Sequence, residues 1–295
     1  MSEKFDFIAS IALNWYKKDK KVAIATVIET WGSSPRPIGS QLVISDDRNF
    51  MGSVSGGCVE GAVIEAAVES IEKGSCQIIE FGVTNETAFS VGLPCGGNIR
   101  IMIEPIGLGN GLPLEFLERL DYSAALGIKC FIVTDIRSYK RSFFEGDKYV
   151  FGDLSSDLSY QIVEDNKTLR SSLLSTTFIN VFAPTLKLII VGAVHISQYL
   201  IEIAKLAGYE VILIEPREAF FLRDGFSDVE LISEWPDKSL KDLTLDNYTA
   251  LVVLAHDPKL DDAALIEAIA SDAFYIGCLG SNTNHEKRLQ RLKLA

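Results

Sequence analysis

Apolar residues recur along this chain with two different spacings, and the alternation of the two predicts a mixed α/β protein. Apolar positions three and four residues apart, typical of helices with one buried face, predict helices over residues 5–17, 62–71, 114–125 and 196–207. Short runs rich in β-branched residues predict strands over residues 22–29, 41–45, 50–54, 76–81, 99–104, 129–134, 178–182, 186–191, 211–214, 250–254 and 274–279.

The order of these elements divides the chain at Ala183-Pro184. We expect an N-terminal α/β domain over residues 1–183 and a C-terminal domain over residues 184–295. The second half follows a βαβαβ order, which predicts a Rossmann-like, doubly wound parallel sheet. In the first half, a polar hairpin around Glu145-Gly146-Asp147 is interpreted as an embellishment of the domain. The strand over 22–29 is interpreted as a parallel-type strand that ends in a ligand-binding loop.

Composition indicates an ordinary globular protein and disfavours two classes of partner. Of the 295 residues, 47% are hydrophobic and 23% are charged. The net charge of -12 and the isoelectric point near 4.8 disfavour a binder of nucleic acid or of anionic membranes. The first residues lack the apolar core of a signal peptide, and no apolar run is long enough to span a bilayer. We therefore expect a cytoplasmic protein.

Five cysteines are spread along the chain without a C-x-x-C pair, which excludes a zinc ribbon and a secreted disulfide framework. Cys76, Cys130 and Cys278 lie in apolar runs and are interpreted as core residues. Cys58 and Cys95 lie instead in glycine-rich turns, over residues 52–61 and 92–98.

The two glycine-rich turns are the strongest candidates for a binding site. Consecutive backbone N–H groups at a turn that opens a helix can bind an anion, and a cysteine there is expected to have a lowered thiol pKa. The alternative is a pair of tight turns with buried small residues. Glu60, beside the first turn, is expected to cap the helix or to pack. Arg36, between two prolines in the polar loop over 30–40, has a planar guanidinium suited to phosphate, the alternative being a solvated residue.

The second half carries a modified dinucleotide motif. A Rossmann unit has G-x-G-x-x-G after its first strand and an acidic residue about 20 positions later, and Gly192 and Glu215 fit those places. However, Val194 and Ser197 replace the second and third glycines, so we expect the Rossmann fold without tight NAD binding. His195, His256 and Ser281 follow predicted parallel strands and are expected to line one edge of the sheet. No histidine pair has metal-ligand spacing, so a metal site is not predicted.

Several motifs resemble the signature of the XdhC/CoxI family. They are Gly-Ser-Ser-Pro-Arg-Pro-Ile-Gly at 32–39, Gly-Ser-Val-Ser-Gly-Gly-Cys-Val-Glu-Gly at 52–61, Cys-Gly-Gly-Asn-Ile at 95–99, Ile-Val-Gly-Ala-Val-His-Ile at 190–196, Glu-Pro-Arg-Glu at 215–218 and Tyr-Ile-Gly-Cys-Leu-Gly-Ser at 275–281. Members are accessory factors for the maturation of molybdenum hydroxylases such as xanthine dehydrogenase and aerobic carbon monoxide dehydrogenase. The resemblance implies a chaperone without turnover. It binds the molybdenum cofactor (molybdopterin), protects it while a partner cysteine desulfurase installs the terminal sulfur, and hands it to the apo-hydroxylase.

With this resemblance, we expect the cofactor-binding residues to be Arg36, Ser55, Gly56, Gly57, Cys58, Cys95, Gly96, Gly97 and Asn98 in the first domain, and Gly192, His195, Glu215, His256, Gly280 and Ser281 in the second. Three features depart from the family pattern: Val194, Asn282 in place of a basic residue, and a chain that stops at Ala295 where relatives continue through a terminal helix. The early end of the chain predicts a shortened Rossmann-like domain and a homodimer that covers the open edge of its sheet. Two alternatives remain, an NAD(P)-dependent oxidoreductase and a scaffold that only bridges hydroxylase and desulfurase.

Overall fold

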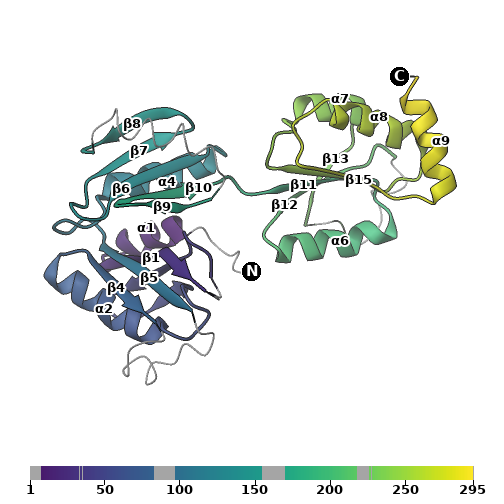
Figure 1. Ribbon diagram of the computed structural model, residues 1–295. Coiled ribbons are helices and arrows are strands. Elements are labelled where there is room, and N and C mark those ends of the chain that lie inside the picture. The colour runs from purple at the N-terminus through teal and green to yellow at the C-terminus, as the bar shows by residue number, and fades with distance from the viewer. Residues whose placement is uncertain are drawn as a thin grey trace. The chain divides into compact units, whose positions relative to one another are not determined.

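The computed structural model describes residues 8–32, 34, 36–82, 97–154, 170–217, 226 and 228–294. The chain forms two compact units, Met1–Pro184 and Thr185–Ala295 (Figure 1). Each unit has its own sheets and its own hydrophobic core, so each is described by itself.

Unit 1 begins with an antiparallel sheet of five strands in the order β3-β2-β1-β5-β4. The strands are β1 (Val22–Trp31), β2 (Gln41–Ser45), β3 (Phe50–Gly52), β4 (Gln77–Phe81) and β5 (Asn98–Pro105). Helix α2 (Glu60–Lys73) covers one face, on which Ala23, Ala25 and Val27 are buried. Val22 and Ile24 are buried on the opposite face. Because both faces of β1 are covered, its sequence is almost continuously apolar rather than alternating.

A second antiparallel sheet completes unit 1, with the strand order β8-β7-β6-β10-β9. Its strands are β6 (Cys130–Asp135), β7 (Arg141–Glu145), β8 (Lys148–Gly152), β9 (Ser172–Leu174) and β10 (Thr177–Phe182). The hairpin around Glu145-Gly146-Asp147 is therefore not an embellishment, because β7 pairs with β6 and extends this sheet. Local periodicity does not reveal the sheet that this hairpin joins, since the other partner of β6 is β10, which comes from a distant segment of the chain.

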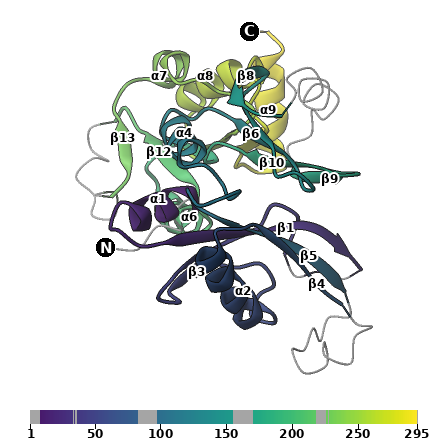
Figure 2. The same ribbon diagram turned by 90° about the vertical axis from the view of Figure 1, so that its left-hand side faces the viewer.

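Two helices occupy part of the space between the sheets, α1 (Ile8–Tyr16) and α4 (Leu114–Ala125). Both lie on the side of β1 opposite α2 (Figure 2). Phe116 and Leu117 of α4 share one core with Ile24 of β1 and Ile132 of β6. Beside the helix pair, the two sheets pack directly on each other, since Met102 of β5 and Phe178 of β10 share another core.

One interpretation of the first sheet was wrong. Strand β1 is antiparallel to both neighbours, β2 and β5, so it is not a parallel-type strand. A β-bulge between Val27 and Glu29 shifts its register with β5. The loop after β1 therefore cannot be assigned a ligand role from the rule for parallel sheets.

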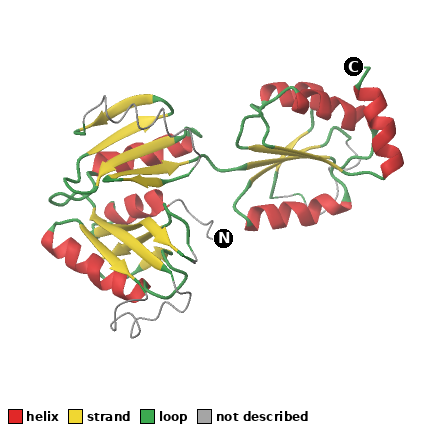
Figure 3. Cartoon of the chain, in the orientation of Figure 1, coloured by secondary structure: helices red, strands yellow, loops and turns green. Residues whose placement is uncertain are grey.

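Unit 2 is a doubly wound parallel sheet, as predicted (Figure 3). Its strand order is β13-β12-β11-β14-β15, with β11 (Lys187–Val191), β12 (Glu210–Ile214), β13 (Glu230–Ile232), β14 (Thr249–Val253) and β15 (Tyr275–Cys278). Helix α6 (His195–Leu206) packs on one face, and α7 (Pro236–Asp242) and α8 (Pro258–Ile269) pack on the other, followed by α9 (Asn282–Leu292). The order reverses between β11 and β14, which in this architecture marks the usual ligand edge.

Among the described residues, no helix combines the length and the apolar character needed to cross a membrane.

Candidate functional site

The first glycine turn lies at the end of the first sheet where β1 finishes and β5 begins. It follows β3, whose Gly52 pairs with Leu42, and it leads into α2. At the same end of the sheet, Trp31 of β1 pairs with Asn98, the first residue of β5. Antiparallel pairing therefore directs the polar loop after β1, the first glycine turn and Gly97 toward the same end of the sheet.

The carboxylate of Glu60 organises this turn. Its Oε1 accepts hydrogen bonds from the Ser53 hydroxyl (2.8 Å) and from the N–H groups of Val54 (3.2 Å) and Ser55 (2.9 Å). Its Oε2 accepts the Gly57 N–H (2.9 Å) and the Ser55 hydroxyl. Glu60 is only 8% exposed, so its charge is satisfied by the loop rather than by solvent.

Two serine hydroxyls take up the remaining N–H groups of the turn. Ser53 Oγ accepts the N–H of Gly56 at 2.9 Å, and Ser55 Oγ accepts the N–H groups of Cys58 and Val59 at 3.0 Å each. Every backbone N–H from residue 54 to residue 59 thus has a partner inside the turn. The N–H groups predicted to bind an anion are already turned toward a carboxylate and two hydroxyls of this chain.

These contacts keep Glu60 ionised. Burial acts to raise the pKa of its carboxyl, but the hydrogen bonds from the Ser55 hydroxyl, the Ser55 N–H and the Ser53 hydroxyl outweigh it and lower the pKa to about 2. The capping role expected for Glu60 takes an unexpected form, because the carboxylate holds the loop before the helix.

Cys58 lies two residues before α2 begins and is half-buried. It packs against the core cluster beneath α2, which includes Val59 and Val63. Gly56 and Gly57 precede it with φ angles of 78° and 111°, in a region of conformational space that favours glycine. The backbone conformation that positions Cys58 therefore requires glycine at residues 56 and 57.

Arg36 lies on the exposed loop after β1. The Ser34 hydroxyl donates to the Arg36 carbonyl at 2.9 Å, and the Gly39 N–H donates to the Val27 carbonyl at 2.8 Å, so the loop folds back onto the bulge of β1. Arg36 is accordingly held at the same end of the sheet as the first glycine turn.

The second glycine turn lies mostly outside the described residues, and with it Cys95 and Gly96. Gly97 is buried, and Asn98 begins β5 half-buried, opposite Trp31. Trp31 is 42% exposed although the rest of β1 is largely covered. Sequence reasoning missed this tryptophan, and its place at the end of an apolar run was the available signal.

A charged pair beside Trp31 was also missed. Arg100 Nη1 of β5 donates to Glu29 Oε2 of β1 at 2.7 Å, and both side chains are part-buried. The two residues are paired only through the register after the bulge, which cannot be read from the sequence.

In unit 2, the predicted residues share one edge of the sheet. Gly192, Glu215, His256 and Gly280 follow the carboxyl ends of β11, β12, β14 and β15, and the parallel register aligns those ends. His256 adopts a left-handed backbone conformation with a φ of 57°, and its side chain is exposed.

Glu215 does not offer a free carboxylate at that edge. It is fully buried, and it accepts the Ala193 N–H at 2.8 Å and two hydrogen bonds of 2.7 Å from the Arg217 guanidinium. Burial acts to raise its pKa, whereas the Arg217 side chain and the Ala193 N–H outweigh burial and lower it. The acidic residue that would bind a ribose in a dinucleotide site is here committed to the protein.

The local backbone structure explains why residue 192 is a glycine. Its φ is 109°, and a Cβ at this position would lie 2.7 Å from the backbone of Ala255 in the loop after β14. The Ser197 hydroxyl donates to the Gly192 carbonyl at 2.5 Å and accepts the Val194 N–H at 3.3 Å. Ser197, which replaces the third motif glycine, therefore closes the turn internally.

The other predicted residues of unit 2 lie at helix starts. His195 is the exposed first residue of α6, and its ring contacts Tyr199 edge-on with centroids 5.1 Å apart. Ser281 is the N-cap of α9 and accepts the Asn284 N–H at 3.3 Å. A Cβ at Gly280 would lie 3.3 Å from Arg288 Nη2.

Arg288 forms a loose buried pair with Asp261. The closest approach is 3.6 Å, from Arg288 Nη2 to Asp261 Oδ2, and both side chains are more than nine-tenths buried. Within the part of the chain that the structure describes, Asp261 Oδ1 and Arg288 Nε have no hydrogen-bond partner. Burial raises the pKa of Asp261. Both unpartnered atoms are shielded from solvent, so a ligand could not reach them without movement of α8 or α9.

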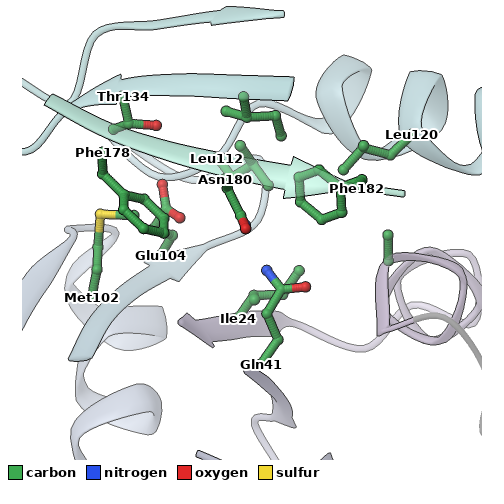
Figure 4. A pocket seen from close by; sticks show the side chains of 12 residues that line it. Ile24, Gln41, Met102, Glu104, Leu112, Leu120, Thr134, Phe178, Asn180 and Phe182 are labelled. Atoms are coloured by element: carbon green, nitrogen blue, oxygen red, sulfur yellow. The ribbon is translucent and has the colours of Figure 1, made fainter. Parts of the chain in front are cut away.

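A cavity of about 20 Å³ lies between the two sheets of unit 1 (Figure 4). Gln41 and Glu104 face it from the first sheet, and Phe178 and Asn180 from the second. Its volume is that of one buried water or two. It is too small to hold a pterin.

Two family models match the chain. Residues 15–82 match the model described as the XdhC and CoxI family, and residues 188–295 match the model described as the XdhC Rossmann domain. The first match contains Arg36, Cys58 and Glu60, and the second contains Gly192 and Glu215.

Two relatives align over almost the whole chain. The chain is 25% identical over 285 residues to the molybdenum cofactor insertion chaperone PaoD of Escherichia coli (strain K12), which covers 97% of this chain and 75% of PaoD. It is 25% identical over 276 residues to a probable xanthine dehydrogenase subunit of Bacillus subtilis (strain 168), which covers 92% of this chain and 82% of that protein.

The fold also matches a solved structure. A crystal structure of a xanthine dehydrogenase from Bacillus halodurans superposes with a TM-score of 0.78 at 22% identity, covering 97% of this chain and 85% of that chain. The likeness extends through both units and establishes the fold.

Proposed function

Because this chain belongs to the XdhC and CoxI family, we propose that it binds the molybdenum cofactor and delivers it to a molybdenum hydroxylase. The observation that carries the proposal is the similarity to a molybdenum cofactor insertion chaperone over 97% of this chain. The motifs in the aligned length include the ordered turn around Cys58. The protein is then a carrier, and the cofactor is its cargo.

We place the binding site at the end of the first sheet, around Cys58. A half-buried thiol suits the metal end of the cofactor, since thiolate sulfur is a ligand for soft metal centres. The guanidinium of Arg36, exposed at the same end, suits the phosphate of the pterin side chain. Asn98, opposite Trp31, and the neighbouring Gly97 border this site. The proposal also includes Cys95 and Gly96, by sequence alone.

We propose three partners beyond the cofactor. The first is an apo-hydroxylase of the xanthine dehydrogenase type, supported by the two relatives. The second is a cysteine desulfurase that sulfurates the bound cofactor. The third is a second copy of the chain, because edge strand β15 leaves Tyr275 54% exposed. Light scattering at micromolar concentration tests the last, and a monomeric mass would refute it.

Cofactor retention tests the proposed function. Purified protein is mixed with released molybdenum cofactor, gel-filtered, and the protein fraction is oxidised and assayed for pterin fluorescence. We expect the wild type and the matched control Cys278→Ala to retain pterin, and Cys58→Ala to lose most of it. Equal retention by Cys58→Ala would exclude Cys58 from the site, and no retention by the wild type would refute the function.

A further inference from the structure

The first glycine turn contains an anion-binding cradle whose anion is part of the chain. Successive N–H groups that converge on one point are the usual means by which a backbone binds phosphate. Here Val54, Ser55 and Gly57 direct their N–H groups at Glu60, from distances of 2.9 to 3.2 Å. The carboxylate therefore occupies the place that a phosphate oxygen would take.

The N–H groups of this cradle offer an external phosphate no favourable interaction. The phosphate would meet the negative charge of Glu60, and the remaining N–H groups of the turn donate to Ser53 and Ser55. Displacing the carboxylate would leave a buried charge without its partners, which is costly. The backbone of the turn is consequently closed to the phosphate end of a ligand.

We propose that Glu60 is a positioning residue that holds the first glycine turn so that the cofactor meets it through the Cys58 thiol, with the metal–sulfur end toward the turn and the phosphate directed elsewhere. This inference rests on the proposed function, and it adds the orientation of the cargo. It also assigns to Glu60 a role that requires its charge rather than its bulk.

The outer side of the turn leaves room for this approach. A Cβ at Gly57 or at Gly61 would contact nothing within 4 Å, so the surface is open at both of these glycines, which flank Cys58 in the sequence. The glycine at position 57 is required by its φ of 111° rather than by a lack of space. The turn is thus anchored from inside by Glu60 and accessible from outside.

Alkylation of Cys58 tests whether Glu60 fills the cradle. Labelling by iodoacetamide is followed by peptide-resolved mass spectrometry, with and without inorganic phosphate, in the wild type, Glu60→Ala and the control Glu72→Ala, an exposed glutamate of the same helix. We expect phosphate to slow labelling in Glu60→Ala, where the cradle is vacant, and to leave the rate unchanged in the wild type and the control. Phosphate that slows labelling in the wild type as much as in Glu60→Ala would overturn the proposal.

Rescue by a small carboxylate tests the consequence for the cargo. Retention of the molybdenum cofactor is expected to fall about tenfold or more in Glu60→Ala, as for other residues that orient a metal ligand. Formate, which can enter the cradle, is expected to restore it. In Glu60→Gln the amide keeps one acceptor but turns an N–H₂ group toward Gly57, so we expect a smaller loss without rescue. Thermal unfolding of each variant verifies that it is folded.

The outcomes separate the two proposals. Full retention by a folded Glu60→Ala, or loss that formate does not restore, would overturn the positioning role. If the wild type does not retain the molybdenum cofactor, the proposed function fails, and the alkylation experiment still decides whether Glu60 fills the cradle.

Discussion

Glu215 and Arg217, two residues apart after β12, form a bidentate ion pair in which both N···O distances are 2.7 Å. The carboxylate also accepts the Ala193 N–H of the loop after β11. In a dinucleotide site, the acidic residue and the glycine turn both bind the ligand. In this chain the corresponding residues, Glu215 and Ala193, are hydrogen-bonded to each other.

We predict that unit 2 does not bind NAD or NADP. The carboxylate that would bind the ribose hydroxyls is committed to Arg217, and the Gly192 turn is packed on Ala255. Isothermal titration calorimetry with each nucleotide is expected to show no heat of binding up to millimolar concentration. Binding in the micromolar range would restore the oxidoreductase as the leading alternative.

Loss of the Arg141 guanidinium should destabilise unit 1. Arg141 of β7 donates to Glu104 of β5 at 2.6 Å, with side chains 5% and 8% exposed, so the pair joins the two sheets in the interior. Removing one partner of a buried ion pair leaves the other charge buried without a partner. Arg141→Met is expected to lower the free energy of unfolding by about 3 to 5 kcal/mol in a urea titration. The exposed Arg137→Met serves as the control and should change it little.

Three cysteines should resist alkylation at pH 8. Burial raises the pKa of Cys76 to about 12, with a further contribution from the Glu104 charge, and burial raises the pKa of Cys130 and of Cys278 to about 11. Only the thiolate reacts, so their labelling by iodoacetamide should lag far behind that of free cysteine under native conditions. Peptide mass spectrometry measures each rate. Rapid labelling of Cys76 would contradict its contact with Arg141.

Glu60 should make the free energy of unfolding depend on pH in the acidic range. Its pKa is lowered in the folded state to about 2, so its contribution is complete above the ordinary glutamate pKa of about 4.3 and is lost as the pH falls toward 2. At pH 7, Glu60→Gln is expected to lower the free energy of unfolding by about 1 to 3 kcal/mol, because buried N–H groups lose an acceptor. Denaturant titrations between pH 7 and pH 2 should show this difference shrinking below about pH 4.3. A difference that does not change with pH would mean that the charge of Glu60 is not what stabilises the turn.

Much of the secondary structure follows from local pattern. The predicted helix over 114–125 coincides with α4, and the predicted strand over 186–191 differs from β11 by one residue. In unit 2, strands connected through helices imply a parallel sheet, which places Gly192 and Glu215 at one edge before any coordinates are known. The second sheet of unit 1 was missed, because one partner of β6, the strand β10, comes from a distant segment, and the other, β7, belongs to the hairpin that was interpreted as an embellishment.

The sequence by itself determined many of the helices and strands, the Rossmann-like unit, and the candidate residues of the glycine turns, because spacing and residue type are local properties. Tertiary structure alone decided how those residues act. Glu60 fills the cradle that the first glycine turn was expected to keep open for an anion. Glu215, which was expected to bind a cofactor, binds Arg217 instead. In both cases the identity of the acceptor was visible in the sequence. Its partner was not, because a hydrogen bond depends on the direction in which the folded backbone places each donor.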